Sequence, residues 1–189
     1  MGDHTVVVVG ASAGGVEALR LLVAGLPADL PAVMLVVLHQ PAGGPSALPR
    51  ILGRAGPLTA SHAVHGQALK VAHIAIAPPD QHLLVLQDTT VLSHGPAEHH
   101  HRPAVDPLFR RAVRWHGSRV IGVILSGGLT DGADGAAAIA LRGGVILVQD
   151  PADAAHSSMP RATLTAVPHA QTAPATELGD LIARLIMGT

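Results

Sequence analysis

The chain has 189 residues, a length that suits one domain with a substantial core. Of these residues, 48% are hydrophobic and 13% are charged, which excludes a disordered or fibrous protein. A formal net charge of -1 and an aromatic content of 1% argue against nucleic-acid binding, and the absence of cysteine excludes disulfides, thiolate metal sites and a cysteine nucleophile.

The N-terminal region shows no targeting signal. No basic segment precedes its short apolar run, so the pattern is not that of a signal peptide. The apolar run from Ala32 to Leu38 is far shorter than the roughly 18 residues that a membrane span needs. We therefore expect a soluble, cytoplasmic protein with no membrane insertion.

Short apolar runs alternate with helical patterns along most of the chain. The runs typical of strands buried on both faces are Val6 to Val9, Val33 to Leu38, Ile121 to Leu125 and Val145 to Val148. Helical spacing occupies residues 16–26, 46–52, 105–115, 133–141 and 177–187, and a further helix is expected to start near Met159. This alternation predicts an open, mainly parallel, doubly wound (Rossmann-like) α/β sheet.

The middle of the chain has a different pattern. Its short apolar runs at 74–77, 83–86 and 90–92 are separated by the turn sequences PPDQ and QD, which predicts an antiparallel hairpin insertion. Residues 93–103, with three adjacent histidines, are expected to form a polar, solvated loop. No linker, repeat or change in composition marks a second domain, so we expect residues 1–189 to form one domain.

The stretch VVVVGASAGGVEAL, Val6 to Leu19, combines a strand, a glycine-rich turn and the start of a helix. A dinucleotide-binding turn would need glycine where Ser12 stands and an acidic residue at the end of the second strand, where His39 stands. A Walker A loop would close with a lysine and a serine or threonine, which are missing here. Gly10 to Gly14 instead fits G-x-S-x-G, the nucleophile elbow, although serine is also a common helix N-cap.

Three side chains with complementary chemistry follow predicted strands: Ser12, His39 and Asp131. Because sites in open α/β sheets form beyond the carboxyl ends of the strands, we expect the three to lie together. A serine nucleophile, an imidazole base and a carboxylate that orients the base make an acyl-transfer centre. Their order along the chain differs from the Ser-Asp-His order of α/β-hydrolases, which disfavours an ordinary lipase or esterase fold.

Each member of this set has a structural alternative. Asp131 is also placed to cap a helix that begins near Gly132, and Asp134 is a rival carboxylate a few residues on. His39 could be a loop histidine without chemistry, because the chain contains 13 histidines.

Several separated motifs occur in one order along the chain. They are GASAGG (10–15), LHQP (38–41), IAPPDQHLLV (76–85), RPAVDPLFR (102–110), VILSGGLTDGADG (123–135) and SMP (158–160). Through them, about Val6 to Leu185 resembles the CheB-type chemotaxis-receptor methylesterases, the protein-glutamate methylesterases. The resemblance implies that Ser12 is the nucleophile, His39 the base and Asp131 the carboxylate that orients the base.

The resemblance also implies a substrate. Family members hydrolyse γ-methyl esters of glutamate on cytoplasmic chemoreceptor helices and release methanol, and some also deamidate receptor glutamines. We therefore expect methylated chemoreceptor helices as the partner and no cofactor. Family proteins commonly carry an N-terminal receiver domain; since the first core strand starts at Thr5, we expect this chain to lack it. The alternative is a catalytically silent signalling or binding module of the same fold.

The remaining expectations concern the surroundings of the site. Backbone amides near Ala13, Gly128 and Leu129 are the predicted oxyanion donors, although Gly128 stands where better-known members have methionine. Arg102 is expected either to lie at the substrate groove or to pair with Asp106 one helical turn away. The adjacent histidines 99–101 lack acidic or histidine partners at recognised ligand spacing, so no metal is expected.

Overall fold

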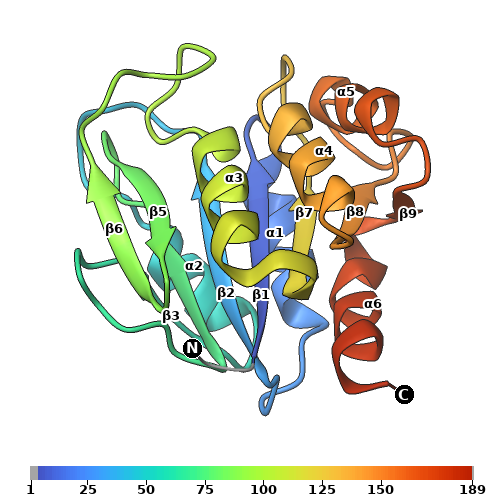
Figure 1. The fold of residues 1–189 in the computed structure, drawn as a ribbon, viewed down its shortest axis with the longest axis horizontal. Coiled ribbons are helices and arrows are strands. Elements are labelled where there is room, and N and C mark those ends of the chain that lie inside the picture. The colour runs from blue at the N-terminus through green and yellow to red at the C-terminus, as the bar shows by residue number, and fades with distance from the viewer. Residues whose placement is uncertain (1–3, 189) are drawn as a thin grey trace.

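A seven-stranded parallel sheet forms the centre of the computed structural model, which describes residues 4–188 (Figure 1). The strand order is β3-β4-β2-β1-β7-β8-β9. The bounds are β1 Thr5–Ala11, β2 Ala32–Leu38, β3 Thr59–His62, β4 His73–Ile76, β7 Val120–Ile124, β8 Val145–Gln149 and β9 Gln171–Ala173. Strand β1 lies between β2 and β7, with Val6 paired to both Val33 and Val120.

Helices cover both faces of the sheet. One face is covered by α1 (Gly15–Ala24), α2 (Leu48–Ala55) and α6 (Ala175–Met187), and the other by α3 (Val105–His116), α4 (Ala133–Leu141) and α5 (Ser158–Ala166). A one-turn 3-10 helix, Gly117–Arg119, leads from α3 into β7.

The alternation of side chains along β1 explains why the strand reads as an unbroken apolar run. Val7 and Val9 belong to the core under α1, α2 and α6, whereas Val6 and Val8 belong to the core under α3, α4 and α5. All four valines are fully buried. With β-branched residues on both faces, this segment favours an internal strand of a parallel sheet.

The predicted α/β architecture is confirmed, and the four long apolar runs are the strands β1, β2, β7 and β8. The predicted extent of the antiparallel hairpin insertion was wrong. Residues 73–76 form β4, which pairs parallel with β2 and β3 in the main sheet. Only β5 (His82–Leu86) and β6 (Thr89–Ser93) pair antiparallel.

The sheet topology fixes where a site can form. From β1 the chain adds β2 and β4 on one side, and later β7, β8 and β9 on the other, so the strand order reverses at β1. Open α/β sheets bind their ligands at the carboxyl ends of the strands beside such a reversal. The segments that leave β1, β2 and β7 contain Ser12, His39 and Asp131 respectively. No helix of the described residues is both long and apolar enough to cross a membrane.

Candidate active site

Ser12 lies in a tight turn between β1 and α1. Its N–H donates to the Ser126 carbonyl at 2.9 Å, and its own carbonyl accepts from the Gly15 N–H at 2.8 Å. Gly14, at φ 74°, is the N-cap residue of α1, and no side-chain hydrogen bond caps that helix. The N-cap alternative for Ser12 is therefore wrong, and its hydroxyl is free of a structural role at the helix start.

Small residues make this turn possible. A Cβ atom on Gly14 would lie 2.7 Å from Oγ of Ser126, and one on Gly10 would lie 2.4 Å from a γ-methyl of Val105. The second contact shows how closely the start of α3 packs against the end of β1. The spacing of glycines in G-x-S-x-G thus reflects crowding around Ser12.

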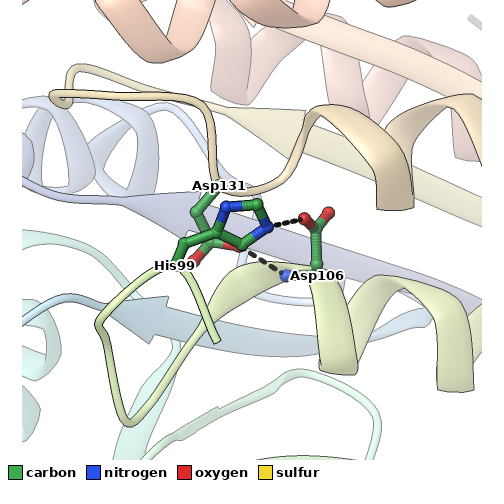
Figure 2. Close-up of side chains that lie close together, drawn as sticks. All are labelled: His99, Asp106 and Asp131. Atoms are coloured by element: carbon green, nitrogen blue, oxygen red, sulfur yellow. Dashed lines mark hydrogen bonds and ion pairs between the residues drawn. The ribbon is translucent and has the colours of Figure 1, made fainter. Parts of the chain in front are cut away.

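Asp131 is buried, with an exposed side-chain fraction of 1%, and accepts hydrogen bonds on both oxygens. Oδ2 accepts from the Val105 N–H at 2.7 Å. Oδ1 accepts from the Asp106 N–H at 3.0 Å, and Figure 2 shows this second contact. These amides begin α3, so Asp131 caps α3; the N-cap residue of α4 is Gly132, without a side-chain bond. The rival carboxylate, Asp134, is exposed in the first turn of α4.

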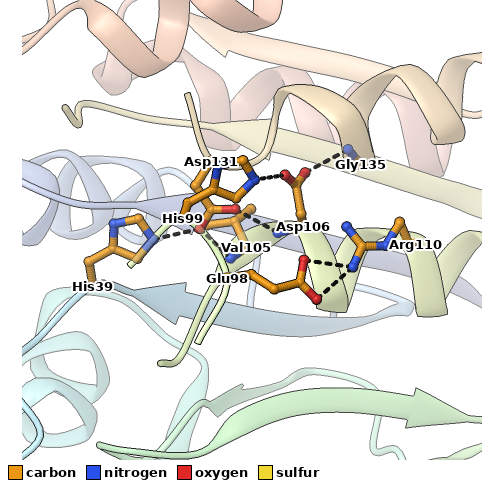
Figure 3. A network of polar contacts seen from close by, with 8 residues as sticks. All are labelled: His39, Glu98, His99, Val105, Asp106, Arg110, Asp131 and Gly135. Atoms are coloured by element: carbon orange, nitrogen blue, oxygen red, sulfur yellow. Dashed lines mark hydrogen bonds and ion pairs between the residues drawn. The ribbon is translucent and has the colours of Figure 1, made fainter. Parts of the chain in front are cut away.

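His39 follows β2 and is joined to Asp131. Its Nε2 atom lies 2.7 Å from Oδ2 of Asp131, and only 4% of its side chain is exposed (Figure 3). Its backbone N–H donates to the Ala11 carbonyl at 3.0 Å, which fixes the histidine beside the residue that precedes Ser12. The second ring nitrogen, Nδ1, is buried and has no hydrogen-bond partner within residues 4–188. That nitrogen is the atom available to accept a proton.

The charge state of Asp131 follows from these contacts. Burial alone would raise the pKa of Asp131, but the hydrogen bonds from His39 and from the amides of Val105 and Asp106 outweigh it and lower the pKa below its usual value. Asp131 is therefore an anion at neutral pH. An anionic partner on Nε2 leaves Nδ1 as the basic nitrogen of His39.

Ser12 and His39 open onto one cavity of about 650 Å³. Its lining is Ser12, Ala13, His39, Gln40, Pro41, Ala42, Asp80, Ala97, His100, His101 and Arg102. The described chain contains no hydrogen bond between the two side chains. The structure thus joins His39 to Asp131 directly and places Ser12 and His39 in the lining of the same cavity.

The predicted oxyanion residues lie in two segments. Ala13 is exposed and lines the cavity next to Ser12. Gly128 and Leu129 lie in the loop after β7, where Leu129 has φ 62° and is 60% exposed. This loop approaches the nucleophile turn through Gly127, because a Cβ atom on Gly127 would lie 2.9 Å from the Cβ of Ser12.

Two residues that the sequence did not single out hold the turn in place. The Ser126 hydroxyl donates to the Ala13 carbonyl at 2.7 Å and accepts from the His156 N–H at 2.9 Å. Gly127 donates its N–H to the His156 carbonyl and accepts from the Met159 N–H. The SGG and SMP motifs contained these residues. Their contacts could not be predicted from the neighbouring sequence, because they join segments about 30 and 110 positions apart.

We expect Gly127→Ala to lower kcat/KM for an ester by at least tenfold, because the new methyl group would collide with the Cβ of Ser12 as well as with Met159. Met159 can move, so the variant should fold with a loss of about 1–3 kcal/mol. Steady-state kinetics and urea denaturation measure both effects. Gly53→Ala, in the exposed interior of α2 with no neighbour of its Cβ closer than 3.9 Å, is the control and should leave the kinetics unchanged while raising stability by about 1 kcal/mol. Equal kinetics for the two variants would contradict the close packing at Ser12.

Arg102 lies at the cavity, as one of its two predicted roles required. It donates to Oδ1 of Asp80 through Nε at 2.9 Å and through Nη2 at 2.6 Å, and its Nη1 donates to the carbonyls of His94 and Gly95. The alternative pairing with Asp106 is wrong. Asp106 is fully buried and accepts instead from the Gly135 N–H at 2.6 Å. Asp80, expected to be only a turn residue, therefore orients the guanidinium.

The loop that contains the three adjacent histidines was expected to be only a solvated loop. Two of these histidines instead contact residues of the site. The His101 ring stacks on the His39 ring with centroids 3.6 Å apart and planes 11° from parallel. The His99 Nε2 atom lies 2.8 Å from Oδ2 of Asp106, an ion-pair distance without hydrogen-bond geometry. Ligand atoms of His99, Asp106 and Asp131 lie within 4.8 Å of one another, so these three could hold a cation. The amides of Val105, Asp106 and Gly135 already point at the two carboxylates, which makes the position less favourable for a cation.

The lowered pKa of Asp131 predicts a pH dependence of stability. A carboxylate with a depressed pKa stabilises the fold fully above its ordinary value, 3.8, and that stabilisation is lost as the pH falls through the lower value of the folded state. We expect the difference in unfolding free energy between the native chain and Asp131→Asn to be largest near pH 7 and to shrink below about pH 4. Urea denaturation from pH 7 to pH 3 measures it. A difference that stays constant over this range would show that the charge of Asp131 does not stabilise the fold.

Comparisons with known proteins agree with this architecture. The family model described as CheB methylesterase matches residues 7–182, and the chain belongs to that family. It is 40% identical over 188 residues to the protein-glutamate methylesterase/protein-glutamine glutaminase of Nocardioides sp., covering 97% of this chain and 51% of the relative. It is 37% identical over 187 residues to protein-glutamate methylesterase/protein-glutamine glutaminase 2 of Caulobacter vibrioides, covering 96% and 54%.

The fold is shared with a solved structure. The crystal structure of the Thermotoga maritima CheB methylesterase catalytic domain superposes with a TM-score of 0.93 at 28% sequence identity, covering 98% of this chain and all of that one. The chain spans about half the length of the curated relatives that it matches.

Proposed function

We propose that residues 1–189 form a single catalytic domain that hydrolyses glutamate γ-methyl esters on methylated cytoplasmic helices of chemoreceptors and releases methanol. The observation that carries the proposal is the buried His39–Asp131 pair, 2.7 Å apart, which opens onto the same cavity as Ser12. The names of the relatives supply the glutamate ester as the group that is hydrolysed. The chemoreceptor helices, and with them the cytoplasm, are what the resemblance to the chemotaxis-receptor methylesterases implies.

In the proposed reaction, the Ser12 oxygen attacks the ester carbonyl carbon while Nδ1 of His39 takes the hydroxyl proton. Asp131 stabilises the imidazolium that forms. The tetrahedral oxyanion faces the amides of Ala13 and of the Gly128–Leu129 segment, and each such donor contributes about 3 kcal/mol in comparable enzymes.

The intermediate then collapses. The bond between carbonyl carbon and methoxy oxygen breaks, the methoxy oxygen takes the proton from His39, and methanol leaves an acyl ester on Ser12. Water enters, gives a proton to His39 as it attacks the acyl carbon, and the carbon–Ser12 bond breaks. Ser12 regains that proton from His39, and the glutamic acid that forms loses the second proton of the water to solvent and leaves as a carboxylate.

The cavity suits a substrate carried on a folded partner. At about 650 Å³ it is larger than a single glutamyl ester needs, and its wall carries Arg102, His100 and His101. Arg102 is held there by Asp80, so the wall offers polar groups of both signs to the side chains that flank the ester. The primary amide of glutamine presents the same kind of planar acyl carbon on a side chain of the same length, so deamidation with release of ammonia is a second reaction of the same site.

The test is methanol release from receptor fragments that carry radiolabelled methyl esters, using receptors encoded in the same genome. The proposal predicts volatile label with the native chain and none above background with Ser12→Ala. The competing function, a catalytically silent binding module, predicts that the fragments bind and keep their label. That outcome, obtained with folded protein and several receptors, would overturn the proposal.

A further inference from the structure

The ring of His101 lies flat against the ring of His39, the base of the proposed reaction. The two ring centroids are 3.6 Å apart and the ring planes are 11° from parallel. Both histidines line the cavity onto which Ser12 opens, and the His101 side chain is half-buried there. The proposed reaction gives His101 no role, so the stack needs an explanation of its own.

The direction of Nδ1 in His39 is only weakly fixed by hydrogen bonds. One such bond holds the ring, between Nε2 and Oδ2 of Asp131 at 2.7 Å, while Nδ1 has no hydrogen-bond partner within residues 4–188. The ring turns about its Cβ–Cγ bond, a torsion with broad minima. Because Nε2 lies closer to the axis of that rotation than Nδ1 does, the bond to Asp131 leaves Nδ1 free to swing.

The stacked ring supplies the missing restraint. Turning the His39 ring about Cβ–Cγ in either sense moves one of its edges toward the His101 ring. At 3.6 Å the two rings are already at van der Waals contact, so a closer approach is repulsive. The plane of His39, and with it the direction of Nδ1, is therefore set by His101.

The turn that carries His101 is held firmly on its N-terminal side. Glu98 and His101 exchange backbone hydrogen bonds at 2.8 and 3.1 Å, and the two residues between them, His99 and His100, have φ values of 50° and 66°. Such left-handed conformations persist in larger residues only where their surroundings hold them. The Glu98 carboxylate accepts from Arg110 of α3 at 2.7 and 2.8 Å, which ties the turn to that helix (Figure 3).

The residue after His101 is held as well. Arg102 donates through Nε and Nη2 to Oδ1 of Asp80 at 2.9 and 2.6 Å. Its Nη1 donates to the carbonyls of His94 and Gly95 at 3.2 and 3.0 Å. The backbone is thus fixed on both sides of His101, which gives its ring a fixed place over His39.

We propose that His101 is a positioning residue, whose ring fixes the plane of His39 so that Nδ1 is aimed at the Ser12 hydroxyl. His101 acts through His39 and carries no proton in the reaction. A misplacement of about 1 Å between reacting groups can lower a rate by on the order of 10²-fold, so loss of the stack should lower kcat far more than it raises KM. The inference rests on the proposed function, because His39 is the base of that reaction.

Three substitutions of His101 separate the shape of the ring from its chemistry. His101→Phe keeps a flat ring without nitrogens, and the half-buried position at the cavity wall leaves room for it. His101→Ala removes the ring, and His101→Leu fills the space without a flat face. We expect kcat on a methyl ester to fall about 10–100-fold in the alanine and leucine variants, with KM within about threefold of native. In His101→Phe, kcat should stay within about threefold of native.

The direct measurement is 13C relaxation of the Cε1–H group of the His39 ring, by NMR on the full chain at one fixed pH. The order parameter should be about 0.8 in the native chain and in His101→Phe, and below about 0.6 in His101→Ala. His169→Ala is the matched control, because His169 is exposed and outside the cavity lining, and it should change neither the order parameter nor kcat. The turn bonds through the His101 backbone, so His101→Ala should fold; if thermal unfolding shows otherwise, His101→Leu replaces it.

A His39 ring that is as rigid in His101→Ala as in the native chain would overturn the inference, whatever the rates. A kcat in His101→Phe as low as in His101→Ala would overturn it too, because a nitrogen of His101 rather than its flat ring would then be required. The relaxation measurement needs no turnover. A native chain that releases no methanol would therefore refute the proposed function separately from the role of the stack.

Discussion

Ser12→Ala is expected to abolish ester hydrolysis while leaving the protein folded. In well-studied serine hydrolases, removal of the nucleophile lowers kcat by about 10⁶-fold, and a residual rate remains from the other groups of the site. We expect a loss of at least about 10⁴-fold here. The half-buried Ser12 side chain makes no hydrogen bond within residues 4–188, so the unfolding free energy should change by no more than about 0.5 kcal/mol.

Initial rates on a methyl ester, together with a thermal unfolding curve, measure the two effects of Ser12→Ala. Ser118→Ala is the matched control, because Ser118 is exposed and precedes β7 at the opposite end from the site. A Ser12→Ala protein with ester hydrolysis within tenfold of the native rate would show that another group is the nucleophile.

Asp131→Asn is expected to lower kcat by about 10³–10⁴-fold and to destabilise the fold by on the order of 1–3 kcal/mol. An asparagine has one oxygen and one NH₂ group, whereas Asp131 accepts hydrogen bonds on both sides. If the NH₂ group takes the place of Oδ1, it faces the Asp106 N–H. If it takes the place of Oδ2, it faces the Val105 N–H and Nε2 of His39. Either orientation sets a donor against a donor in a buried place.

Asp134→Asn is the control for Asp131→Asn. Asp134 is exposed in the first turn of α4, so its substitution should lower stability by no more than about 0.5 kcal/mol and leave kcat unchanged. Kinetics and urea denaturation of the two variants distinguish the rival carboxylates. Equal losses of activity, or a larger loss in Asp134→Asn, would contradict the assignment of Asp131.

The α/β architecture was predictable because the central strands can be identified from their own sequences. Residues 6–9 and 33–38 are β-branched or aliphatic on both faces, and such runs occur in parallel sheets covered by helices. Edge strands lack that signal. Strand β3 has the sequence TASH and β9 has three residues, so neither stands out from a loop. The sequence of β4 resembles part of the following hairpin because its apolar run is short and a turn sequence follows it.

The part of the site that could be predicted is the set of residues that directly follow strands. Ser12, His39 and Asp131 each follow a strand beside the reversal of strand order, and this placement brings them to one edge of the sheet. The sequence did not reveal that Asp131 caps α3, because the amides of Val105 and Asp106 lie about 25 positions earlier in the chain. The roles of Ser126, His99 and His101 depend on contacts of the same long-range kind.

The most direct test of the account is covalent labelling by a serine-directed fluorophosphonate, followed by mass spectrometry of the intact chain and its peptides. If His39 activates the Ser12 hydroxyl, one adduct per chain forms, it maps to Ser12, and it is lost in Ser12→Ala and strongly slowed in Asp131→Asn. A folded native chain that forms no adduct, or one labelled at a different residue, would contradict an acyl-transfer centre at this edge of the sheet.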